Sequence, residues 1–118
     1  MRTIKFRGKS IKDGKWYYGY FLVNHFDEYT ICGKDFAVQV IPETVGQFIG
    51  LLDLKSKEAY HGDFISASGY SNWIIEWDRS GWYMKTTNID EKYNHSIPEY
   101  FIIIGNKFDN PELLEATK

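Results

Sequence analysis

A chain of 118 residues makes one domain, or two very small subdomains, and it is long enough to fold without disulfides or metals. Ile occurs 13 times and aromatic residues 21 times, against four Ala and six Leu, so the composition predicts a mainly β fold. The single cysteine, Cys32, excludes an intramolecular disulfide, and no apolar run is long enough to span a membrane. Without a signal-peptide pattern, this cysteine usage predicts a cytoplasmic protein.

The net charge of −2 is unevenly distributed along the chain. Residues 1–15 carry six basic residues and one acidic residue, a net +5, whereas the remainder carries eight basic and 15 acidic residues, a net −7. The acidic body argues against a nonspecific grip on nucleic acid. A basic N-terminal patch would bind an acidic partner, and a second copy of the chain is one such partner. The candidate interaction surface comprises Lys5, Arg7, Lys9, Lys12 and Lys15.

The first expected element is a β-hairpin. Ile4–Arg7 alternates apolar and charged residues, as a strand with one wet face does. Asp13-Gly14 tolerates the positive φ angles of a tight turn, and Lys15–Val23 is the return strand. Gly19 within it indicates a bulge or the close approach of another backbone. The alternative to a binding role for the basic residues is that they only wet an edge strand and discourage aggregation.

The remaining expected elements are also mostly strands. The clearest hairpin joins Trp73–Trp77 to Gly81–Lys85, because Asp78 and Gly81 suit the ends of a type I turn. A polar, mobile loop is expected over Thr86–Pro98. Further short strands are predicted at Tyr29–Cys32, Phe36–Ile41, Gln47–Leu52 and Asp63–Ala67.

The C-terminal segment predicts one more strand and a short helix. Tyr100–Ile104 is apolar throughout, which is typical of a strand covered on both faces. Asn110 can cap a helix of about two turns whose first position is Pro111.

Few residues in the sequence suggest a catalytic or metal-binding site. His61 and Asp63 lie two residues apart on a strand and are the nearest approach to a catalytic pair, but an Asp at a strand entrance usually accepts backbone N–H bonds instead. His25 and His95 are far from His61 in sequence, so no metal site is expected. Nucleotide-binding and hydrolase motifs are missing. We therefore expect no catalytic residues, no cofactor and no enzymatic activity.

Eight aromatic residues admit two interpretations. Small barrels can stack bases or hold peptides on exposed rings beside basic groups. In a chain short of Leu and Ala, however, rings are also the natural core material. We expect most of them in the core and one or two on the surface. The eight are Trp16, Tyr17, Tyr18, Tyr20, Trp73, Trp77, Trp82 and Tyr83.

Several short blocks follow one another in a characteristic order: Ile4–Arg7, then Glu43-Thr44-Val45-Gly46-Gln47, then Tyr60-His61-Gly62-Asp63, and near the end Asn110-Pro111-Glu112-Leu113-Leu114. Over nearly the whole length they resemble the YopX family of small proteins encoded by phages and prophages. The second block and the Gly62-Asp63 pair are the most specific. The matching residues that we expect to be structural are Phe6, Glu43, Thr44, Gly46, Gln47, Gly50, Gly62, Asp63, Trp77, Gly105, Asn110 and Pro111.

The resemblance implies a small SH3-like β-barrel with a short C-terminal helix over residues 46–118. It also implies an N-terminal β subdomain over residues 1–45 that supports oligomerisation. Family members often carry Asp-x-Asn-Gly where this chain has Asp53-Leu54-Lys55-Ser56, so a wider turn is expected there.

The resemblance, the missing catalytic motifs and the segregated charge together predict a non-enzymatic protein-interaction module of phage origin. Its expected partner is a second copy of itself, or a host or phage protein, and no membrane is involved. The alternative is a small β-barrel that binds nucleic acid through the basic hairpin and exposed aromatic rings.

Overall fold

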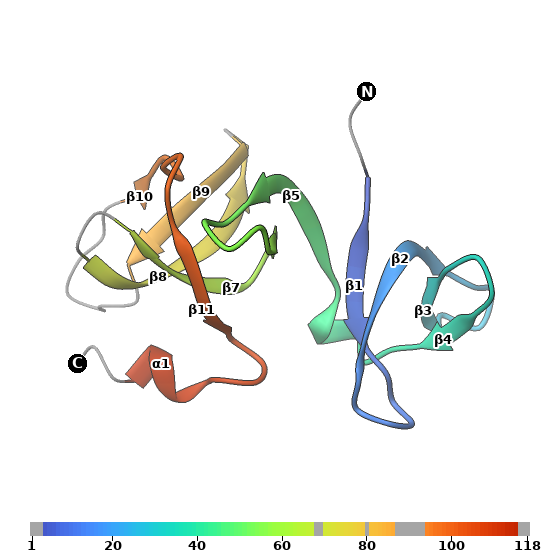
Figure 1. Ribbon diagram of the computed structural model, residues 1–118. Helices are drawn as coiled ribbons and strands as arrows, with labels where there is room; N and C mark the ends of the chain where they lie inside the picture. Colours follow the sequence, from blue (N-terminus) through green and yellow to red (C-terminus); the bar gives the residue numbers. More distant parts are fainter. Residues whose placement is uncertain (1–3, 68–69, 80, 87–93, 116–118) are drawn as a thin grey trace. The chain divides into compact units, whose positions relative to one another are not determined.

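The computed structural model describes residues 4–67, 70–79, 81–86 and 94–115 (Figure 1). These residues form antiparallel β-sheets with very little helix, which confirms the prediction of a mainly β protein. The chain divides into two compact units, Met1–Gly50 and Leu51–Lys118.

The N-terminal unit is built on an antiparallel sheet in the order β4-β3-β2-β1-β5 (Figure 1). The predicted first hairpin is confirmed as β1 and β2, with Gly14 at φ +68° in the turn. Strand β1 is an interior strand between β2 and β5, because the start of β5 returns to pair with it. The elements are β1 (Phe6–Lys9), β2 (Trp16–Val23), β3 (Tyr29–Cys32), β4 (Ala37–Gln39), the 3-10 turn η1 (Pro42–Thr44) and β5 (Gly46–Leu52).

One face of this sheet forms a small core. The ring of Phe21 lies 5.5 Å from that of Phe6 and 5.4 Å from that of Tyr29, and Ile31 and Val40 are fully buried. These residues come from alternate positions of neighbouring strands, so they share the face that turns away from water. The opposite face of the sheet is therefore the outer one.

Thr44 fastens η1 to β1. Its hydroxyl donates to the carbonyl of Ile41 at 2.6 Å and accepts the N–H of Lys9 at 2.9 Å, and the residue is buried. The two residues that follow η1 then pair with β1, Gly46 with Arg7 and Gln47 with Phe6. Within the Glu-Thr-Val-Gly-Gln block, Thr44, Gly46 and Gln47 therefore make the contacts that join η1 and β5 to β1.

Replacing Thr44 with valine should lower the free energy of unfolding by about 1.5 kcal/mol, because the shape is kept while a buried N–H and a carbonyl lose their partner. Urea denaturation followed by tryptophan fluorescence measures the change. Thr44→Ser keeps the hydroxyl and is the matched control. A Thr44→Val variant as stable as the wild type would contradict the prediction, and an equal loss in Thr44→Ser would mean that the methyl group contributes as much as the hydroxyl.

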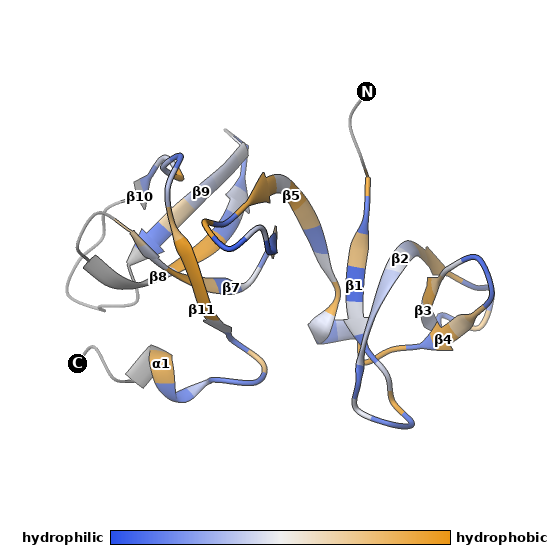
Figure 2. Cartoon of the chain, in the orientation of Figure 1, coloured by the Kyte–Doolittle hydropathy of each residue, from blue (hydrophilic) through white to orange (hydrophobic). Residues whose placement is uncertain are grey.

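The C-terminal unit contains a five-stranded antiparallel sheet in the order β10-β9-β8-β7-β11 (Figure 1). Among the described strands, the two edge strands β10 and β11 do not pair with each other, so no closed barrel is formed. Figure 2 shows apolar residues along β5 and β11. The strands of this unit are β6 (Glu58–Tyr60), which neighbours β5, then β7 (Asp63–Ala67), β8 (Tyr70–Asp78), β9 (Gly81–Thr86), β10 (Asn94–His95) and β11 (Ile102–Asn106).

Two expectations for the C-terminal segment are wrong. Ile104 of β11 is 40% exposed, so this strand is not covered on both faces. The Asn110 side chain does not cap the helix α1 (Glu112–Glu115), because it accepts the N–H of Asn106 at 3.1 Å instead. Of the expected loop at Thr86–Pro98, residues 87–93 lie outside the described part of the chain.

The aromatic residues are less buried than expected. Of the eight considered above, Trp73 is buried, whereas Tyr18, Tyr20 and Trp77 are exposed and the other four are half-buried. The fully buried large residues of the C-terminal unit are instead Tyr60, Phe64, Phe101, Ile65 and Ile75. Alternation along a strand separates two faces but does not tell which of them meets the core.

The turn after β5 is tight, contrary to the expectation of a wider one. The backbone N–H of Ser56 donates to the carbonyl of Asp53 at 2.9 Å, and the N–H of Asp53 donates to the carbonyl of Lys57 at 2.9 Å. Ser56 reaches this geometry with φ +63°, a conformation that favours glycine. The serine therefore adopts the backbone conformation that a glycine would accept without strain.

Replacing Ser56 with glycine should raise the free energy of unfolding by about 1 kcal/mol, because it removes the strain of a side chain in the left-handed region. Thermal unfolding should show a melting temperature several degrees higher. Ser56→Ala keeps a Cβ at the same φ and should give no such gain. A stabilised alanine variant would show that the hydroxyl, and not the backbone conformation, limits stability.

Candidate interaction surface

The outer face of the N-terminal sheet gathers basic and aromatic side chains. The alternation of β1 directs Arg7 and Lys9 to this face, and the register places Tyr18 opposite Arg7 and Trp16 opposite Lys9. Residues directly opposite in an antiparallel pair project to the same side. We call this surface the basic–aromatic face; it comprises Lys5, Arg7, Lys9, Trp16, Tyr18, Tyr20 and Leu22.

Three cations of this unit lie over aromatic rings. The guanidinium carbon of Arg7 lies 4.7 Å from the ring centre of Trp16, and the Lys9 ammonium lies 5.8 Å from the same ring. The Lys5 ammonium lies 5.8 Å from the ring centre of Phe48. Such cation–π contacts are attractive, most strongly where water is displaced. Arg7 is only 6% exposed, so it contacts the Trp16 ring but presents little surface to a partner.

The edge-strand alternative for the basic residues is wrong, because β1 lies inside the sheet. The five predicted basic residues also do not form one patch. Lys5, Arg7 and Lys9 belong to the basic–aromatic face, whereas Lys12 and Lys15 lie in the exposed turn between β1 and β2. The turn at Asp13-Gly14 separates Lys12 and Lys15 from the residues of the strand.

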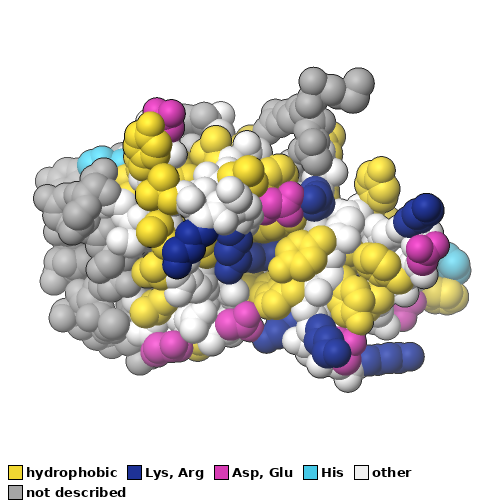
Figure 3. Space-filling view, viewed as in Figure 1, with side chains coloured by type: hydrophobic (Ala, Val, Ile, Leu, Met, Phe, Trp, Pro, Cys, Tyr) yellow, Lys and Arg dark blue, Asp and Glu magenta, His cyan; other side chains and the backbone are white. Residues whose placement is uncertain are grey.

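Apolar groups dominate the exposed part of this face. Tyr20 is 72% exposed, Tyr18 is 46% exposed and Leu22 is 44% exposed, at alternate positions of β2. Hydrophobic side chains lie among lysines and arginines on the surface drawn in Figure 3. Contiguous exposed apolar groups of this kind mark interaction sites more often than isolated ones do.

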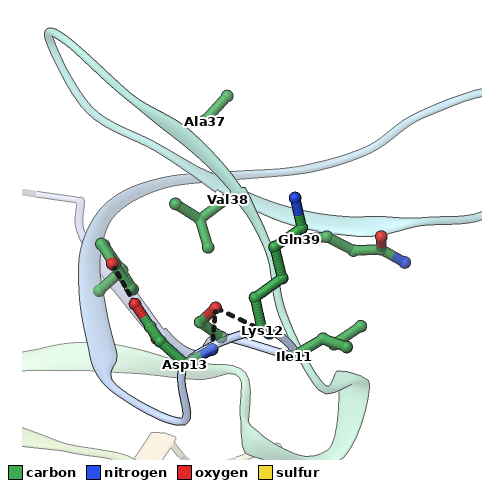
Figure 4. A pocket seen from close by; sticks show the side chains of 8 residues that line it. Ile11, Lys12, Asp13, Ala37, Val38 and Gln39 are labelled. Carbon is green, nitrogen blue, oxygen red and sulfur yellow. Dashed lines mark hydrogen bonds between the residues drawn. The ribbon is translucent and has the colours of Figure 1, made fainter.

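A second feature of the N-terminal unit is the turn between β1 and β2. Asp13 accepts the N–H of Lys15 at 2.9 Å. It also accepts the hydroxyl of Tyr17 at 2.7 Å (Figure 4). The Lys15 N–H, followed by the Tyr17 hydroxyl, lowers the pKa of Asp13, and the same carboxylate raises the pKa of Tyr17. The Ser10 hydroxyl oxygen accepts the N–H groups of Lys12 and Asp13, so the turn is well ordered by its own side chains.

His61 and Asp63 do not form a pair. Asp63 is buried and accepts the N–H of Tyr60 at 2.8 Å, which confirms its structural interpretation. His61 Nε2 instead lies 3.0 Å from a carboxylate oxygen of Glu76 on β8, a partner that nothing in the local sequence indicates. The hydrogen bond from His61 lowers the pKa of Glu76. Among the described residues, no group of three or more His, Cys, Asp or Glu side chains could hold a metal ion.

Comparison with known protein families matches residues 2–115 to the family described as YopX protein. The chain belongs to the YopX family. The crystal structure of protein EF1440 from Enterococcus faecalis is similar in fold, with a TM-score of 0.56 and 17% sequence identity, over 97% of this chain and 99% of that chain. At this identity the likeness concerns the fold alone. A search of curated proteins finds no match.

The YopX motif residues of the C-terminal unit are mostly structural. A side chain at Gly105 would place its Cβ 2.5 Å from the Asn110 amide oxygen, so the glycine lets Asn110 reach the N–H of Asn106. Gly62 at φ +91° accepts the N–H of Lys107 and donates to the carbonyl of Ile75. Trp77 departs from the expected structural role, because its ring is exposed and meets Trp82 edge-on at 4.7 Å. No described helix is long and apolar enough to cross a membrane.

Proposed function

We propose that this YopX-family protein is a non-enzymatic protein-interaction module of phage origin that acts in the bacterial cytoplasm. The observation that carries the proposal is the row of exposed apolar groups on β2, Tyr18, Tyr20 and Leu22. Tyrosines bring large contact areas at low entropic cost and are enriched in interfaces. We also propose that the C-terminal unit is SH3-like, because SH3-like barrels are built from small antiparallel sheets.

The first partner to consider is a second copy of the chain. Residues 1–50 carry seven basic and five acidic residues, a net +2, whereas residues 51–118 carry seven basic and 11 acidic residues, a net −4. Opposite net charges attract two copies and steer their encounter at low salt. A host or phage protein with an acidic rim is the other partner that this charge pattern favours.

Light scattering during size-exclusion chromatography, at micromolar concentration and low salt, tests the assembly. We expect a wild-type oligomer and a monomeric Tyr20→Ser variant, because the serine removes the most exposed ring of the basic–aromatic face. Phe26→Ser is the matched control, since Phe26 is 71% exposed but lies outside the strands of the sheet. A monomeric wild type counts against self-association.

Capture of proteins from lysate of the host bacterium tests the wider proposal. A partner retained by the wild type and by Phe26→Ser, but lost with Tyr20→Ser, would support an interaction through the basic–aromatic face. A monomeric wild type that also captures no partner dependent on Tyr20 would overturn the proposal.

Single-stranded nucleic acid is the second candidate partner. The specific observation in its favour is the interleaving of Lys5 and Lys9 with Trp16 and Tyr18, because bases stack on exposed rings while lysines hold the phosphates. Fluorescence anisotropy with labelled DNA and RNA oligonucleotides at about 50 mM salt tests it. We expect affinity to fall with salt and with the double variant Lys5→Ala/Lys9→Ala. No binding at this salt concentration would falsify the nucleic-acid hypothesis.

A further inference from the structure

A cavity of about 480 Å³ lies between strand β4 and the turn that joins β1 to β2 (Figure 4). Figure 4 shows Val38 pointing toward this turn and the Lys12 side chain reaching from the turn toward β4. Volumes of this size accommodate a short peptide segment or a small ligand. The lining residues are Ser10, Ile11, Lys12, Asp13, Tyr17, Ala37, Val38 and Gln39.

Strand β4 is an edge of its sheet, so one side of its backbone faces away from β3. The N–H of Val40 donates to the carbonyl of Tyr29, and the N–H of Gly33 donates to the carbonyl of Phe36. In an antiparallel ladder the bonding residues alternate, so Val38 also pairs with β3 while Ala37 and Gln39 direct their N–H and C=O groups away from it.

One of these outward groups, the C=O of Gln39, is already hydrogen-bonded. The N–H of Ile11 donates to the carbonyl of Gln39 at 3.1 Å, and next to it Ser10 and Val40 form a single bridge. The turn thus begins to pair with β4 and then departs from it. Ala37 and Val38, the part of β4 beyond this short pairing, belong to the cavity lining.

The side chains around the cavity define the chemistry of an occupant. Ile11 and Val38 provide apolar walls, and Lys12 provides a cation. The Asp13 carboxylate is already engaged by Tyr17 and by the N–H of Lys15. Within the described part of the chain, no ion pair engages Lys12. An occupant that carries a carboxylate therefore meets a complementary charge.

We propose that this cavity binds an extended acidic peptide segment of a partner protein, which adds a strand to β4. Its backbone would bond to Ala37, an apolar side chain would contact Ile11 and Val38, and a Glu or Asp would meet Lys12. Strand addition of this kind combines main-chain bonds for affinity with side-chain pockets for specificity. Strand β4 also has no proline or charge within Ala37–Gln39 that would block it. The inference rests on the proposed function as a protein-interaction module.

Capped hexapeptides that alternate valine with glutamate are the probe, and the full-length protein is observed by two-dimensional NMR. We expect shifts at Ala37, Gln39 and Ile11 and slower hydrogen exchange at the Ala37 N–H. A valine–lysine peptide should bind at least about tenfold more weakly, and Lys12→Glu should reverse that preference. N-methylation of alternate peptide bonds should abolish binding without changing the protein.

The outcomes separate this inference from the proposed function. Equal binding of acidic and basic peptides, binding insensitive to N-methylation, or no binding at millimolar peptide would each overturn the cavity proposal. None of these results bears on self-association or on partner capture through Tyr20, because both depend on the basic–aromatic face. Conversely, selective peptide binding together with a wild type that neither assembles nor captures a partner through Tyr20 would retain the cavity and refute the basic–aromatic face.

Discussion

Replacing Asp53 with alanine should lower the free energy of unfolding by about 4 kcal/mol. The side chain is buried, one carboxylate oxygen accepts the N–H groups of Lys55 and Lys57, and the other accepts the N–H of Ile103 at 3.0 Å. The variant would leave three backbone donors without their acceptor, and hydrogen bonds to a charged group are the costly ones to lose. Urea denaturation followed by tryptophan fluorescence measures the change.

The same residue joins two distant parts of the C-terminal unit. The bond to Ile103 ties the turn after β5 to β11, 50 residues further along the chain. The N–H of Leu54 also donates to the carbonyl of Phe101 at 3.0 Å, so the turn and β11 are paired at two points. Loss of the carboxylate should therefore loosen the β11 edge, visible as faster hydrogen exchange at Ile103.

Acid titration provides the control for this prediction. Burial alone raises the pKa of Asp53, but the N–H donors of Ile103, Lys57 and Lys55 outweigh it and hold the pKa below its usual value. A carboxyl with a lowered pKa stabilises the fold above its unfolded pKa of about 3.9, and that stability is lost as pH falls through the folded pKa. The stability difference between wild type and Asp53→Asn should therefore be full near pH 7 and shrink below about pH 4. A stability difference that is constant down to about pH 2 would show that the ionised carboxylate stabilises the fold no more than the neutral carboxyl does.

The bounds of a strand could be predicted where the local sequence determines them. Tyr29–Cys32 and Asp63–Ala67 have the predicted bounds, because alternation and flanking turn residues define them. Strand order depends on contacts far apart in sequence and could not be read in the same way. The pairing of β5 with β1 makes β1 an interior strand, whereas the pairing of β1 with β2 brings the Arg7 guanidinium over the ring of Trp16.

The candidate site was predicted only in part for the same reason. The basic stripe at Lys5, Arg7 and Lys9 follows from alternation along one strand. Its aromatic neighbours follow from the register of β1 with β2, which the turn at Asp13-Gly14 sets and which could have been derived from the sequence. The cavity beside Ala37 arises because the turn residues Ser10 and Ile11 return to β4, an arrangement with no local signal.

Replacing Gly19 with alanine should be the most damaging single change in the N-terminal unit, at about 3 kcal/mol or more of unfolding free energy. An ideal Cβ at this position would lie 2.2 Å from the backbone carbonyl oxygen of Cys32. Backbone cannot yield as a flexible side chain does, so β2 and β3 would have to separate. Urea denaturation measures the loss, and NMR should show the largest shifts along the Tyr20–Cys32 pairing.

Gly14→Ala is the matched control, because it also adds one methyl group to a glycine of this unit. Gly14 has φ +68° and open space around it, so only the backbone strain of about 1 kcal/mol applies. Tyr18 and Tyr20 flank Gly19 on β2, so the clash should also displace the basic–aromatic face and weaken its binding, whereas Gly14→Ala should leave binding intact. If the two alanine variants cost the same stability and bind alike, the close approach of β2 to β3 has no influence on either property.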